Sequence, residues 1–144
     1  MNNTASKYYK AALTTAMRYG WPALALFITH EICGHVIHAY ARWPAIDMPL
    51  HFFGGVSIAV LVSGAVTVLT ERQLIRKPEI LIHITLVFAL TCTAALFWEF
   101  AEWTADHTIS SNCQLGRDDT MLDLFLGAVG GGIYSLFLIF GSSE

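Results

Sequence analysis

Four acidic residues stand beside long apolar segments in the second half of the chain. Glu99 and Glu102 lie near the end of one apolar segment, and Asp119 and Asp123 lie at the start of the next. Spacings of three and four residues place both carboxylates of each pair on one face of a helix. A charge in hydrocarbon is costly unless it is paired, protonated or bound to a ligand. The pattern therefore predicts a functional site.

A histidine on an earlier apolar segment can complete such a site. His51, Glu99, Glu102 and Asp123 offer the imidazole and carboxylate donors that suit Zn²⁺, Mn²⁺ or Fe²⁺. A bound metal lowers the pKa of a coordinated water and neutralises a phosphate or a developing oxyanion. We expect these four residues as ligands of a divalent metal such as Zn²⁺. In a catalytic site, we expect Glu99, Glu102, Asp119 and Asp123 as the acid and base groups.

Each of these acids also has a purely structural interpretation. Asp119 and Asp123 can cap the helix that follows them, because T-x-x-D is similar to a capping box. Glu99 and Glu102 lie near a helix C-terminus, where the macrodipole disfavours a negative charge. They therefore require a cation, and Arg117 in the following loop can supply it as a structural salt bridge.

The run HEICGH, which begins at His30, is similar to the zinc-protease motif HExxH but does not fit it. The position four residues after His30 is Gly34, and His35 comes one position later. Helical spacing instead places Glu31 near His35, and His35 near His38. This spacing alone assigns no role to these residues.

Composition sets the class of protein. The 144 residues are 55% hydrophobic and only 13% charged, with a mean hydropathy of +0.54. A soluble domain is less apolar and more charged, so the chain is expected to be an integral membrane protein. We expect one all-α domain over residues 1–144, because no repeat or linker divides the chain. The net charge of −3 and the scattered basic residues do not indicate a nucleic-acid partner.

The apolar segments predict a bundle of about four transmembrane helices. They cover about residues 20–40, 49–69, 80–103 and 120–140, and each has roughly the twenty residues that a bilayer core requires. The first could be confused with a secretory signal, but its apolar character continues beyond Ile28 to about Tyr40. Asp47 is a candidate cap for the second helix, which has Pro49 at its start.

The basic residues predict the orientation. Six of the eight Lys and Arg residues fall in the N-terminal segment or in the loop between the second and third helices, which assigns both regions to the cytoplasm; they are Lys7, Lys10, Arg18, Arg72, Arg76 and Lys77. Both termini are then cytoplasmic, most simply at a bacterial inner membrane. The acids, His51, His35 and His38 fall toward the outer side.

Three motifs resemble those of YjdF-type inner-membrane proteins, relatives of the VanZ-like superfamily. They are Asp47-x-x-x-His51-Phe-Phe-Gly-Gly, Trp98-Glu99-Phe-x-Glu102-Trp and Asp119-Thr-x-x-Asp123. Arg117, six positions before Asp123, also matches the VanZ-like pattern. Gly127 replaces an asparagine of that pattern and Glu102 a frequent glutamine, which favours the YjdF branch. The resemblance implies a small polytopic envelope protein, linked in the VanZ case to teicoplanin resistance, without a settled biochemical activity.

Two functions remain open at this stage. In the first, the acids and His51 form a metal-assisted site that acts on a lipid head group or a lipid-linked envelope precursor. In the second, the protein performs no reaction and binds a lipid, a cation or a partner protein through the same cluster. Both require that the second, third and fourth helices meet at their outer ends, with His51 near Glu99, Glu102 and Asp123.

Overall fold

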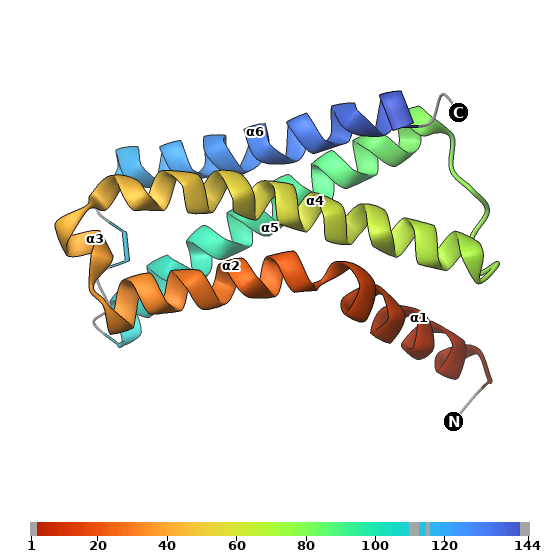
Figure 1. Ribbon diagram of the computed structural model, residues 1–144, viewed down its shortest axis with the longest axis horizontal. Helices are drawn as coiled ribbons and strands as arrows, with labels where there is room; N and C mark the ends of the chain where they lie inside the picture. The colour runs from red at the N-terminus through yellow and green to blue at the C-terminus, as the bar shows by residue number, and fades with distance from the viewer. Residues whose placement is uncertain (1–2, 110–112, 115, 142–144) are drawn as a thin grey trace.

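The computed structural model describes residues 3–109, 113–114 and 116–141, apart from the side chains of His35, Ala41 and Pro44. Every regular element in these ranges is helical, as the all-α prediction requires (Figure 1). The elements are α1 (Asn3–Tyr19), α2 (Trp21–Glu31), a π-helical turn (Ile32–Val36), α3 (Ala39–Arg42), a 3₁₀ turn (Pro44–Ile46), α4 (Asp47–Glu71), α5 (Ile80–Thr108) and α6 (Arg117–Gly141).

The three long helices α4, α5 and α6 form the centre of the bundle and pack on one another. Each is long and apolar enough to cross a membrane. Successive helices run in opposite directions, so the start of α4, the end of α5 and the start of α6 share one end of the bundle (Figure 1). This alternation brings the acidic residues of the three helices to the same end of the bundle.

Two helix boundaries change how the acidic residues must be interpreted. Helix α4 begins at Asp47, with Ile46 as its N-cap and no side-chain capping bond, so the capping role predicted for Asp47 is wrong. Helix α5 continues to Thr108 rather than ending at residue 103. Glu99 and Glu102 are therefore not in its last turn, where the macrodipole acts. Their need for a partner arises from burial instead.

The segment predicted as the first transmembrane helix is not one continuous α-helix. The α-helical part ends at Glu31, and a π-helical turn follows over Ile32–Val36. His38 has a positive φ of 50°, and α3 begins after it. A π-turn inside a helical segment frequently marks a functional position.

The N-terminal residues form α1, a helix that precedes the four segments predicted to span the membrane. It ends before Gly20, packs along α4 and is joined to the far end of α4 by an ion pair of 3.1 Å between Arg18 and Glu71. The side chain of Arg72 also donates a hydrogen bond to Thr14. The start of α1 and the end of α6 lie at the end of the bundle opposite α3 (Figure 1).

Glycines set the close packing of the long helices. A Cβ atom on Gly55 of α4 would meet the backbone carbonyl of Gly127 in α6, and one on Gly130 would meet the carbonyl of Phe52. At Gly55, Gly127 and Gly130 the lack of a side chain thus lets the helix backbones approach closely. Gly54 has different surroundings, because a Cβ there would meet nothing within 4 Å.

Candidate functional site

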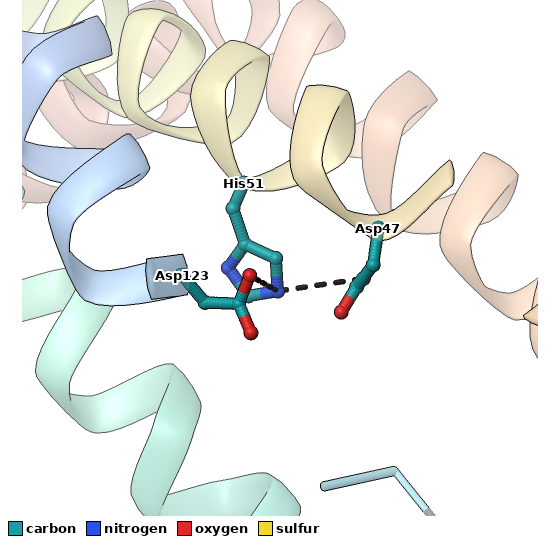
Figure 2. A group of neighbouring side chains, drawn as sticks. All are labelled: Asp47, His51 and Asp123. Atoms are coloured by element: carbon teal, nitrogen blue, oxygen red, sulfur yellow. Dashed lines mark ion pairs between the residues drawn. The ribbon is translucent and has the colours of Figure 1, made fainter. Parts of the chain in front are cut away.

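The imidazole of His51 is the centre of the acidic cluster. Its Nε2 atom lies 3.5 Å from Oδ1 of Asp47 and 3.8 Å from Oδ1 of Asp123 (Figure 2). Its Nδ1 atom lies 3.8 Å from Oε1 of Glu99. His51 and Asp47 share a helix face because they are four residues apart on α4, whereas Glu99 comes from α5 and Asp123 from α6. The ring thus faces carboxylates of three helices.

Glu99 is the most completely buried acid of the cluster, with 3% of its side chain exposed. Its Oε2 atom accepts a hydrogen bond of 3.1 Å from the side-chain amide of Gln114. Its Oε1 atom, which faces His51, is buried and has no hydrogen-bond partner among the described residues. A buried acceptor without a donor is costly, so this oxygen is the least well satisfied atom found in the cluster.

Glu102 connects the cluster to α2. Its Oε1 atom accepts a hydrogen bond of 2.8 Å from the indole of Trp98 and lies 3.9 Å from Nε2 of His30. Trp98 is thus part of the site. The Nδ1 atom of His30 lies 2.8 Å from the Tyr40 hydroxyl. Burial and the nearby carboxylate of Asp47 raise the pKa of Tyr40, so its phenol stays protonated.

The cationic groups beside these acids are imidazoles. Arg117, the structural partner expected for Glu99 and Glu102, instead pairs with Asp118 at 3.7 Å, and both side chains are almost fully exposed. Among the described residues, the carboxylates of Asp47, Glu99, Glu102 and Asp123 form ion pairs with His51 and His30. The salt-bridge interpretation with Arg117 therefore does not explain the buried carboxylates.

Two overlapping sets of side chains have the spacing of metal ligands. Asp47, His51 and Asp123 form one set, and His51, Glu99 and Glu102 form the other. Within each set, one donor atom per residue lies within 4.8 Å of the others. To hold Zn²⁺, the donor atoms would have to come within about 2.0–2.3 Å of the ion. An imidazole and several carboxylates are donor types that suit Zn²⁺ or another transition metal ion.

The cluster includes the four residues predicted as ligands and one more. His51, Glu99, Glu102 and Asp123 converge as expected, and Asp123 faces His51 from inside α6 instead of capping that helix. Asp119 is half-buried in the first turn of α6 and belongs to neither ligand set. Its predicted catalytic role stays a prediction, as do those of the other acids.

Sequence reasoning missed Asp47 and His30 as members of the site. The spacing of four residues between Asp47 and His51 was a sufficient signal for Asp47. No spacing pointed to His30, because its partner Glu102 is far away in the chain. His38 is exposed, and the side chain of His35 lies outside the described residues.

Comparisons with known proteins place these residues in a family context. The family described as "Predicted membrane protein (DUF2238)" matches residues 3–143. An uncharacterized protein of Thermotoga maritima is 30% identical over 102 residues, which cover 70% of this chain and 51% of that protein. The chain thus spans about half the length of this relative. No solved structure matches.

Proposed function

The chain belongs to the DUF2238 family of predicted membrane proteins, and we propose that it is a multi-pass membrane protein that binds a divalent metal ion, in the first place Zn²⁺, in the cluster around His51. The observation that carries the proposal is the buried Oε1 atom of Glu99, which faces His51 and has no hydrogen bond among the described residues. A metal ion between these groups would satisfy that oxygen and offset the negative charge of the cluster.

The proposal includes four membrane crossings with both termini in the cytoplasm of a bacterial cell. Helices α4, α5 and α6 provide three crossings, and α2 with its π-turn provides a fourth beside α4. An even number of crossings agrees with the start of α1 and the end of α6 lying at one end of the bundle (Figure 1). The likeness to YjdF-type proteins of the VanZ-like superfamily belongs to the same proposal.

A metal-assisted reaction on a lipid head group is a second candidate. The number of carboxylates favours this candidate. Glu99 and Glu102 of the second ligand set are additional to the two acids of the first set. One carboxylate can therefore act as a base while another binds the ion. Water would supply the oxygen of the new bond to phosphorus and pass a proton to that carboxylate. The departing alkoxide would then recover the proton. Binding without a reaction requires none of these steps.

Zinc binding by the purified protein tests the proposal. The full chain in detergent is treated with a chelator, and Zn²⁺ is titrated by calorimetry while thermal unfolding is followed in parallel. A free Zn²⁺ concentration of about 100 times the Kd stabilises the folded state by about 2.7 kcal/mol. We expect His51→Ala and Glu99→Gln to abolish both the binding and this stabilisation.

Asp118→Asn is the matched control. It also removes a carboxylate near the start of α6, but Asp118 is 99% exposed and lies outside the cluster. We expect it to bind Zn²⁺ like the parent. Equal binding by the parent, Glu99→Gln and Asp118→Asn, or no binding by the parent, contradicts the proposed site.

A further inference from the structure

A cavity of about 160 Å³ lies between α2, α4 and α5 beside the proposed metal site. His30 and His51 line it at one end, and Gly54, Ile58 and Thr91 line it farther along. From His51 to Ile58 the cavity follows α4 for seven residues, or about 10 Å at the rise of an α-helix. It therefore extends from the polar cluster into the apolar part of the bundle.

The wall of this cavity determines what can fill it. Apart from the two histidines, Thr91 and the indole of Trp98, the lining side chains are aliphatic or aromatic, or the residue is glycine. An apolar cavity of about 150 Å³ stays dry and accepts a hydrocarbon group, because water needs two to four polar partners. In a membrane, the hydrocarbon groups available to fill such a cavity are the acyl chains of lipids.

We propose that this cavity holds an acyl chain of a membrane phospholipid whose phosphate lies at the His51 end, against the metal ion. The phosphate position rests on the proposed metal site, because without a cation the surrounding carboxylates would repel an anion. The acyl-chain position rests on the cavity alone. The pairing of a dry cavity with a polar end matches an amphiphile rather than a soluble anion.

Gly54 allows a direct test because it faces this cavity. A Cβ atom on Gly54 would meet nothing within 4 Å, so a larger side chain there would occupy the cavity without displacing a helix. Gly141, at the end of α6, has the same open surroundings and does not line the cavity. Gly54→Leu and Gly141→Leu are therefore a matched pair.

Trp98 reports on the occupant, since its indole lines the cavity. The other tryptophans, Trp21, Trp43 and Trp103, are 67%, 63% and 53% exposed and can be changed to Phe. The full-length single-tryptophan protein in detergent is titrated with phosphatidylglycerol that carries brominated acyl chains, which quench a nearby indole. We expect saturable quenching in the parent and in Gly141→Leu, and a loss of several-fold in Gly54→Leu.

A series of substitutions with increasing side-chain volume at residue 54 distinguishes a filled cavity from a misfolded protein. Gly54→Ala and Gly54→Val are measured beside Gly54→Leu, and quenching should fall as the volume at residue 54 rises. Quenching that does not saturate in the parent, or that is the same across the Gly54 series, overturns the inference.

Removing the metal separates the two proposals. With a chelator, the lipid should bind several-fold more weakly, because the phosphate loses its cation. Quenching that depends on Gly54 in a protein that binds no Zn²⁺ supports the acyl-chain site and overturns the metal site. Zinc binding without Gly54-dependent quenching overturns the acyl-chain site alone.

Discussion

At the scale of single residues, the acids of the cluster have distinct surroundings. Glu99 keeps one buried oxygen without a hydrogen bond, whereas an oxygen of Glu102 accepts the Trp98 indole proton. Asp47 and Asp123 both face Nε2 of His51. Two imidazoles, those of His51 and His30, lie beside these four carboxylates. The proposed metal ion would offset the excess of acidic groups.

Glu102→Gln distinguishes a functional cluster from a structural one. The glutamine keeps the shape and can still accept the bond from Trp98, but it removes one of several neighbouring negative charges. We expect the melting temperature without metal to be unchanged or raised, while the affinity for Zn²⁺ falls at least about tenfold. Differential scanning calorimetry and zinc titration of the same preparation measure both quantities.

Glu71→Gln is the control for that substitution. Glu71 is an exposed glutamate whose ion pair with Arg18 should contribute only about 0.2–1 kcal/mol. If Glu102 served only to hold the bundle together, its loss would lower stability strongly, since breaking a buried ion pair costs about 3–5 kcal/mol. A large fall in the melting temperature of metal-free Glu102→Gln, beyond that of Glu71→Gln, would support the structural role.

At the scale of the elements, two adjacent glycines on α4 have opposite surroundings. A Cβ on Gly55 would collide with the backbone of Gly127 in α6, whereas one on Gly54 would enter open space. The contact of α4 with α6 is thus made by backbone atoms, which cannot change rotamer. The same contact positions His51 of α4 opposite Asp123 of α6.

We expect Gly55→Ala to destabilise the protein and Gly54→Ala to leave it unchanged or slightly more stable. Overpacking costs about 1–3 kcal/mol, whereas replacing a helical glycine by alanine gains about 0.5–1 kcal/mol. Thermal unfolding in detergent measures the difference. Zinc affinity should also fall in Gly55→Ala, because α4 and α6 would separate at the site. Equal stability of the two variants would be incompatible with this packing.

At the scale of the whole molecule, the buried acidic side chains of the described residues gather at one end of the bundle. The site is assembled from the start of α4, the end region of α5 and the start of α6, with His30 of α2 beside it. Large apolar side chains such as Phe97, Phe125 and Phe137 are exposed on the outside, as lipid contact requires. The site therefore lies inside one end of the bundle.

Cysteine labelling in intact cells tests which face that is. In a variant with Cys33 and Cys92 changed to Ala, Cys113 remains in the connection between α5 and α6, and a membrane-impermeant thiol reagent should label it from outside. As a control, Glu79→Cys in a protein lacking all three native cysteines places a thiol before α5, on the opposite side. It should react only after permeabilisation. The reverse pattern would invert the topology.

The sequence by itself determined the class of the protein and the end of the helix bundle at which the site lies. Apolar segments of membrane-spanning length predicted the helices α4, α5 and α6, and their short connections imply the alternating directions that bring the acids to one end. Helical spacing also predicted which carboxylates share a face. These are properties of each helix and of chain connectivity, so they can be read from local pattern.

Only the tertiary structure decided which side chains meet. Helical period fixes neighbours along one helix, but the rotation and axial shift of each helix depend on packing, here on contacts such as Gly55 with Gly127. That packing made His51 the centre, added Asp47 and His30, left Asp119 outside the ligand sets and placed Arg117 with Asp118. It also left Glu99 Oε1 buried without a donor among the described residues, because three helices meet around it and no local pattern encodes their convergence.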